Sequence, residues 1–159
     1  MDNKKLYPPP PGWRFQVFDI VDGLAISNRV REPTDFDSLG VDAIVCLEDW
    51  DYAWSPPVPQ NHLYLHVPID DDDTVDPKTR EGARFVAQLV QGQSRVLVHC
   101  TEGLNRSALV AARALMFLGY EAQDAIDLVR AKRGDDDGLP ALGNRSFEQW
   151  LLAEGAVSD

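Results

Sequence analysis

Short apolar runs in the N-terminal half of the chain are typical of strands. One run over residues 15–20 precedes the Asp22-Gly23 pair, and a second over residues 24–26 follows it. An Asp-Gly pair between two apolar runs favours a tight turn, so this region is predicted to form a hairpin. Residues 41–47, 63–67 and 96–98 form further apolar runs, which predict buried strands.

Longer segments with apolar residues every three or four positions predict helices. One is expected to begin at Asp76-Pro77, with the aspartate as N-cap and the proline at the first helical position, and to end at Gly92. Two more cover residues 107–118 and 122–133, and each is followed closely by a glycine that can end a helix.

Two further helices are suggested by their predicted starts. Thr34 is expected to begin a short helix, and Asp37 three residues later suggests a capping box. Ser146, with Gln149 three residues later, is expected to cap a final helix that buries Phe147.

The order of these elements predicts the fold class. Strands that alternate with helices imply an α/β protein with a central, mainly parallel sheet of about four or five strands flanked by helices. Ligands of such sheets bind beyond the carboxyl ends of the strands. Residues 1–13 contain a run of four prolines and are expected to form an extended tail, which leaves residues 14–159 as a single domain.

Composition narrows the classes of function. The chain has 159 residues and a net charge of −11, which argues against binding nucleic acid or an anionic membrane through the overall field. Residues 108–118 are interrupted by Arg113 and are shorter than the roughly 20 residues of a membrane span. With no recognisable secretion signal and only two cysteines, we expect reduced thiols and a cytoplasmic location.

The segment HCTEGLNRS, from His99 to Ser107, carries the clearest candidate chemistry. It places Cys100 at the end of a buried strand and Arg106 at the start of a helix. Inward-facing N–H groups of such a loop, together with the positive end of the helix, favour a thiolate and attract phosphate. The planar guanidinium of Arg106 can bind two phosphoryl oxygens, and Gly103 permits a positive φ angle.

This segment, of the form HC-x-x-G-x-x-R-S, resembles the signature loop of the cysteine-based protein tyrosine phosphatases, and the chain is most similar to their dual-specificity branch. The resemblance implies that Cys100 attacks phosphorus and becomes a phosphocysteine, without a metal or other cofactor. Ser107 would hydrogen-bond the sulfur, and His99 would set the loop's conformation by hydrogen bonding. The phosphate-binding residues would be Thr101, Glu102, Gly103, Leu104, Asn105 and Arg106.

The family also uses an aspartic acid on an upstream loop to protonate the leaving group. The segment PIDDDD over residues 68–73 follows a predicted strand. Its match to the family's Pro-apolar-x-Asp pattern selects Asp71, which precedes Cys100 by 100 − 71 = 29 residues. Asp70 and Asp72 stay open as alternatives, because spacing does not exclude a shift of one residue.

Two features at the end of the predicted strand over residues 41–47 add hypotheses. Cys46 stands where some phosphatases of the superfamily carry a cysteine that bridges to the nucleophile, which implies a reversible Cys46–Cys100 disulfide after oxidation. A small core residue is the other interpretation of Cys46. The aromatic residues Trp50, Tyr52 and Trp54 follow, and could form a wall for a substrate ring or anchor their loop to the domain.

The sequence therefore predicts a hydrolase that removes phosphate from tyrosine, and from serine or threonine, in a phosphorylated protein or peptide. Glu102 and Leu104 differ from the lysines of the superfamily's lipid phosphatases. The loop is also similar to that of RNA 5′-triphosphatases, although the net charge disfavours long RNA, and a phosphate-binding module without turnover is a third possibility. His62 and His66 have a metal-like spacing, but no nearby cysteine or carboxylate set supports a metal site.

Overall fold

The hairpin predicted around Asp22-Gly23 is present. The structure is a computed structural model that describes residues 9–49 and 57–157. In it, β1 (Val17–Val21) pairs antiparallel with β2 (Leu24–Ser27), and Gly23 takes a φ of 85° in the turn. The glycine is required there, because a positive φ is costly for a residue with a Cβ atom.

Three parallel strands complete the sheet. They are β3 (Ala43–Cys46), β4 (Leu63–His66) and β5 (Val96–His99), and the strand order is β1-β2-β5-β3-β4. The central strand β5 runs parallel to both β2 and β3, and every residue of these three strands is buried. The predicted fold class is confirmed, and the segment after β5 begins at the middle of the sheet's carboxyl edge.

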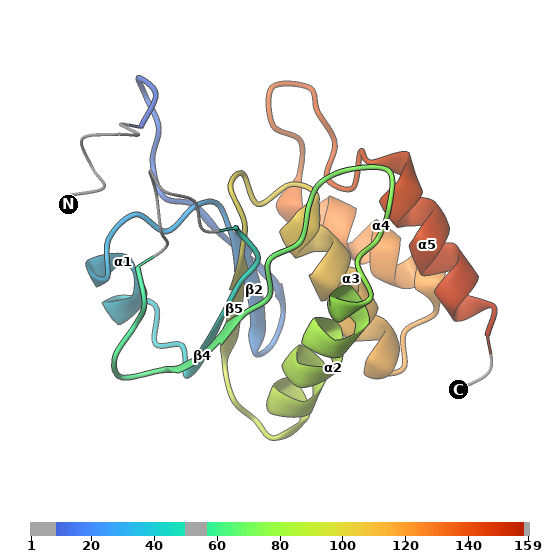
Figure 1. Cartoon of the computed structure of the whole chain (residues 1–159), viewed down its shortest axis with the longest axis horizontal. Coiled ribbons are helices and arrows are strands. Elements are labelled where there is room, and N and C mark those ends of the chain that lie inside the picture. The colour runs from blue at the N-terminus through green and yellow to red at the C-terminus, as the bar shows by residue number, and fades with distance from the viewer. Residues whose placement is uncertain (1–8, 50–56, 158–159) are drawn as a thin grey trace.

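Helices cover both faces of the sheet, unequally (Figure 1). The larger apolar core lies between the sheet and four helices, and the smaller one holds Phe36 of the short α1 against the other face. The helices are α1 (Thr34–Asp37), α2 (Lys78–Gln91), α3 (Arg106–Phe117), α4 (Ala122–Arg133) and α5 (Arg145–Gly155). Helix α3 follows the segment after β5 directly, as the sequence predicts, and most of it is buried.

Both predicted capping boxes are wrong. Helix α1 starts after Pro33, which has no side chain that can cap it. The carboxylate of Asp35 accepts hydrogen bonds from the N–H groups of Arg31 and Glu32, which precede the helix. Helix α5 is capped by Asn144 rather than Ser146. The side-chain oxygen of Asn144 accepts from the N–H groups of Ser146 and Phe147, which are the donors that an N-cap residue satisfies.

The N-terminus of α2 is capped by the residue that the sequence predicts. Pro77 takes helical dihedral angles, and the Asp76 carboxylate accepts a 2.9 Å hydrogen bond from the N–H of Lys78. Asp76 therefore supplies the predicted cap, although the hydrogen-bonded helix begins at Lys78. Within the described ranges, no helix combines the length and apolarity needed to cross a membrane.

Replacement of Leu115 by alanine tests the larger core. Leu115 on α3 is fully buried, so Leu115→Ala should lower the free energy of unfolding by about 2–5 kcal/mol, through lost apolar burial and the cavity left behind. Leu152→Ala on α5, where the leucine is 40 % exposed, is the matched control and should cost well under half as much. Urea unfolding measures both, and equal losses would contradict the assignment of the core.

Candidate active site

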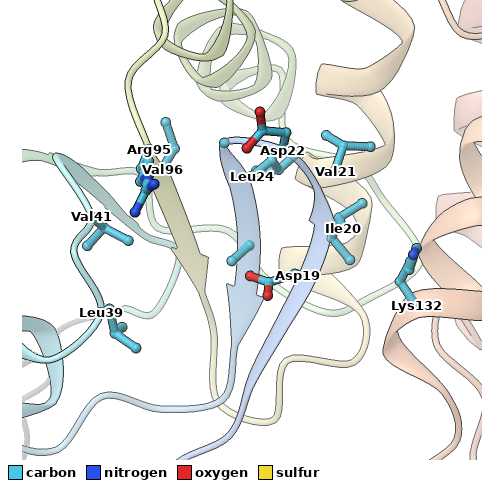
Figure 2. A pocket seen from close by; sticks show the side chains of 12 residues that line it. Asp19, Ile20, Val21, Asp22, Leu24, Leu39, Val41, Arg95, Val96 and Lys132 are labelled. Carbon is cyan, nitrogen blue, oxygen red and sulfur yellow. The ribbon is translucent and has the colours of Figure 1, made fainter.

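Two cavities lie at opposite ends of the parallel strands. A broad cavity of about 510 Å³ lies by the β1–β2 turn, and Figure 2 shows Asp22, Arg95 and Lys132 around it. The other cavity, of about 270 Å³, lies at the carboxyl edge. Only the second is lined by a cysteine, and it brings together most of the residues predicted from the sequence: Asp71, Cys100, Thr101, Glu102, Leu104, Asn105 and Arg106.

The carbonyl groups of the loop after β5 accept hydrogen bonds from residues outside the cavity. Arg133, at the end of α4, donates to the carbonyl oxygens of Glu102 (3.2 Å) and Gly103 (2.8 Å), and the N–H of Leu142 donates to that of Leu104 (3.0 Å). The N–H of Gly103 points instead at Cys100 Sγ, 3.3 Å away. Carbonyl groups that bond to residues outside the cavity, with an N–H group that points into it, form the arrangement of an anion-binding nest.

Gly103 is the one loop residue for which a side chain has no room. Its φ is 66°, and a Cβ atom there would lie 2.7 Å from the carbonyl carbon of Ser27 and 2.9 Å from the backbone nitrogen of Asn28. The loop therefore rests on the backbone at the end of β2. Glycine is required here both by the backbone conformation and by this close approach.

Cys100 is held by two hydrogen bonds at the start of the loop. Its sulfur lies 3.3 Å from the Ser107 hydroxyl and 3.3 Å from the Gly103 N–H, and the residue is only 2 % exposed. The Gly103 N–H donates to the sulfur, and the sulfur and the Ser107 hydroxyl form the second hydrogen bond. These contacts fix the position of the sulfur in the cavity.

Arg106 is anchored at both ends of its guanidinium group. One nitrogen donates to the Ile69 carbonyl (3.3 Å) and the other to the Thr101 hydroxyl (2.8 Å). Thr101 donates in turn to Glu48 Oε1 (2.7 Å), which also accepts from Arg29 Nε (2.7 Å). Neither Glu48 nor Arg29 stands out in the sequence, since each is one charged residue at a strand end.

Asp71 is the one aspartate of residues 70–73 that lines the cavity. Asn105 donates to one of its carboxylate oxygens (3.0 Å) and Asn144 to the other (2.8 Å). The side chain of Asp72 is used elsewhere, since it accepts hydrogen bonds from the N–H and hydroxyl of Thr74. The geometry thus favours Asp71 over Asp72, and Asp70 is exposed and does not line the cavity.

His99 is buried behind the loop and is neutral. Burial, with smaller contributions from Arg29 and His66, lowers the pKa of His99 to about 3. Neither ring nitrogen has a hydrogen-bond partner among the described residues. The structure therefore does not show the hydrogen bonding through which His99 was expected to set the loop's conformation.

Cys46 ends β3, the strand beside the one that leads to Cys100. It pairs with His99 in the β3–β5 ladder, and both cysteines are free thiols. Burial raises the pKa of Cys46 to about 12, so at neutral pH this thiol is a weak nucleophile. The Cys46–Cys100 disulfide stays a prediction, and Trp50, Tyr52 and Trp54 lie outside the described residues.

Comparison with known proteins shows the family of the chain. The family model for the dual specificity phosphatase catalytic domain matches residues 27–152. A dual specificity protein phosphatase 1B of Arabidopsis thaliana is 30 % identical over 118 residues, which cover 72 % of this chain and 70 % of the plant protein. The chain belongs to the dual specificity phosphatase family and is a protein phosphatase of the tyrosine and dual-specificity class.

Solved structures show the same fold. The active form of Tk-PTP superimposes with a TM-score of 0.68 at 27 % identity, over 87 % of this chain and 95 % of that one. Human DUSP28 superimposes with a TM-score of 0.68 at 20 % identity, over 93 % and 96 % of the two chains.

Replacement of Gly103 by alanine tests how the loop is seated. Because the new Cβ would overlap the backbone of Ser27, Gly103→Ala should displace the loop and lower kcat/KM by about 10²-fold or more, since small misplacements at a reacting centre cost that much. Gly119→Ala is the control. It also has a positive φ, but a Cβ there meets no atom within 4 Å, so only stability should fall. Phosphatase assays that find full activity for Gly103→Ala would contradict a role of the close contact between the loop and β2 in activity.

The burial of His99 predicts a dependence of stability on pH. The pKa of His99 is about 6.5 in the unfolded chain and about 3 in the fold. At a pH between these two values, the unfolded state therefore binds one more proton than the folded state. Stability should therefore decrease as pH falls below about 6.5, by up to about 1.4 kcal/mol per pH unit. Urea unfolding at pH 7, 6 and 5 should give a steeper decrease for the wild type than for His99→Gln, and equal slopes would exclude a buried neutral histidine.

Proposed function

We propose that this phosphatase hydrolyses phosphate monoesters of tyrosine, and of serine and threonine, in proteins through a phosphocysteine at Cys100. The observation that carries the proposal is that one cavity of about 270 Å³ is lined by Cys100, Arg106 and Asp71. A nucleophile, a cation for the phosphoryl oxygens and a proton donor are the three groups that the reaction requires.

In the first step, the Cys100 thiolate attacks phosphorus and the bond from phosphorus to the ester oxygen breaks. Arg106 and the N–H groups of the loop bind the non-bridging oxygens, and protonated Asp71 gives its proton to the leaving oxygen. In the second step, water attacks the phosphocysteine, Asp71 takes a proton from that water, and the sulfur leaves as a thiolate. The Ser107 hydroxyl, 3.3 Å from Sγ, then stabilises the departing sulfur.

The lining of the cavity supports a substrate with one phosphate group. Among its residues Arg106 is the only cation, whereas Glu102 is acidic and Leu104 apolar, so there is no partner for a second phosphate. A groove of about 540 Å³ continues from Thr101 and Glu102 between the Pro10–Gln16 region and the Asp136–Asp137 turn. A groove of this size can accommodate the chain on one side of a phosphorylated residue.

Hydrolysis assays with the full chain test the proposal. Phosphate release from phosphotyrosine, phosphoserine and phosphothreonine peptides should exceed release from RNA that carries a 5′-triphosphate. Cys100→Ser should lose turnover but still bind the phosphopeptide, whereas Arg106→Ala should lose both. Faster release from the triphosphate RNA, or peptide binding without hydrolysis by the wild type, would contradict the proposal.

Asp71→Asn tests the assignment of the proton donor. An amide cannot donate a proton to the leaving oxygen, so kcat for an alkyl phosphate should fall by about 10²–10⁴-fold. An aryl phosphate with a nitro substituent should be affected much less, because its leaving group needs no proton. Asp70→Asn is the matched control on the neighbouring exposed carboxylate and should retain activity. A full rate of Asp71→Asn on the alkyl ester would show that another group is the acid.

Asn144 is expected to position Asp71 while it caps α5. Asn144→Asp keeps the capping oxygen but removes the amide donor and adds a negative charge beside Asp71. The unfolding free energy should change little, because aspartate caps helices as well as asparagine, while kcat should fall about tenfold, as one lost hydrogen bond suggests. Asn144→Ala should lose activity and also about 1 kcal/mol of stability. Unchanged kcat in both variants would exclude the positioning role.

A further inference from the structure

A cluster of polar side chains that the phosphatase reaction does not use lies behind the active-site loop. Cys46, Glu48 and His99 each direct one potential metal-ligand atom into a common space, and these three atoms all lie within 4.8 Å of one another. All three residues are buried, with exposed fractions of 0 %, 2 % and 0 %. The cluster lies on the face of the sheet that α1 covers, where the Phe36 ring is 6.4 Å from the His99 ring.

Strand geometry brings these residues together. Cys46 and His99 are direct partners in the parallel β3–β5 ladder, so they occupy the same face of the sheet. Glu48 follows Cys46 by two positions, and its carboxylate comes within 3.8 Å of His99 Nδ1. The three residues therefore converge through main-chain positions that the sheet fixes.

Unsatisfied polar atoms in this cluster need an explanation. Among the described residues, Glu48 Oε2 and both ring nitrogens of His99 are buried without a hydrogen-bond partner. Buried polar atoms normally find a partner, and groups that lack one in the protein often contact an ion or an ordered water. Cys46 adds a sulfur that lies 4.0 Å from the Glu48 carbonyl oxygen.

We propose that Cys46, Glu48 and His99 form a buried binding site for a single zinc ion. Thiolate, imidazole and carboxylate are the three side-chain ligands of protein zinc, with bonds of about 2.0–2.3 Å. An ion in the common space reaches all three after small side-chain rotations, and it gives partners to the Glu48 and His99 atoms that lack them. Binding releases the Cys46 thiol proton to solvent, and three protein ligands leave one tetrahedral position for another group.

Mixed sulfur and nitrogen ligands also decide which class of cation fits. Magnesium and calcium prefer oxygen ligands throughout, whereas a site with one sulfur, one nitrogen and one oxygen suits a borderline cation such as Zn²⁺. The remaining carboxylate oxygen, Glu48 Oε1, is held by Arg29 and Thr101 at 2.7 Å each. These two hydrogen bonds orient the carboxylate so that Oε2 faces the cluster, as second-shell groups do in metal sites.

The site is connected to the active site through Glu48, and through Thr101 to Arg106. Zinc could therefore alter turnover from this position, but it could do so equally by binding the Cys100 thiolate. A test of the site consequently needs a readout of the metal itself, independent of phosphatase activity. Such a readout also keeps failure of this inference separate from failure of the proposed function.

Cobalt substitution provides that readout on the full chain. One Co²⁺ per chain should bind the wild type and give the near-ultraviolet absorption of a sulfur–cobalt bond. The two cysteines serve as matched controls: Cys100→Ser should keep this absorption, and Cys46→Ser should lose it and bind zinc at least tenfold more weakly. Absence of the absorption in the wild type, its persistence in Cys46→Ser or its loss in Cys100→Ser would each overturn the site.

Circular dichroism would detect a failure of Cys46→Ser to fold. In that case a second measurement, which needs only the wild type, tests the site. Crystals of the wild type grown with stoichiometric zinc should show an anomalous peak at the zinc edge between Cys46, Glu48 and His99. An ordered water molecule at that position, or zinc bound only at Cys100, would overturn the proposal.

Discussion

The close approach of Gly103 to the end of β2 is the contact on which the rest of the site depends. With a φ of 66° and no room for a Cβ atom, this residue lets the loop turn directly against Ser27 and Asn28. The turn sends the carbonyls of the loop outward, where Arg133 binds two of them, and sends the Gly103 N–H toward the Cys100 sulfur. The contact at the Cys100 sulfur and the outward carbonyl groups therefore follow from one backbone conformation, on which the proposed mechanism depends.

Electrostatic interactions in this acidic chain act locally. The net charge is −11, yet ions at physiological strength screen exposed charges beyond about 8 Å. Behind the loop Arg29 is paired with Glu48, and at the cavity Arg106 stands beside the acidic Asp71 and Glu102. The N-terminus of α3 adds positive potential there. The proposed binding of a phosphate group is therefore compatible with the acidic composition.

The acidic segment over residues 68–73 shows how far sequence reasoning extends. Pattern matching selected Asp71 but left its neighbours open, because four consecutive carboxylates are locally equivalent. The fold separates them: the distant Asn105 and Asn144 bind Asp71, while Asp72 accepts from Thr74, two residues away. Asn144 was not predicted as a site residue, because its contact with Asp71 spans 73 residues of sequence. The oxygen of its amide caps α5, and the nitrogen of the same amide donates to Asp71.

The sequence alone determined the strands, the helices from α2 to α4, the loop between Cys100 and Arg106 and the class of chemistry, because each depends on periodicity or on residues close together in the chain. Tertiary structure decided which aspartate faces the cavity, which residue caps α5, and that Glu48, Arg29 and Arg133 support the loop. It also decided that His99 is neutral and lies with Cys46 and Glu48. The cap of α5 is a local choice between two good capping residues, Asn144 and Ser146. The other outcomes depend on burial and on contacts across 19 to 73 residues, and local patterns of residues carry no information about either.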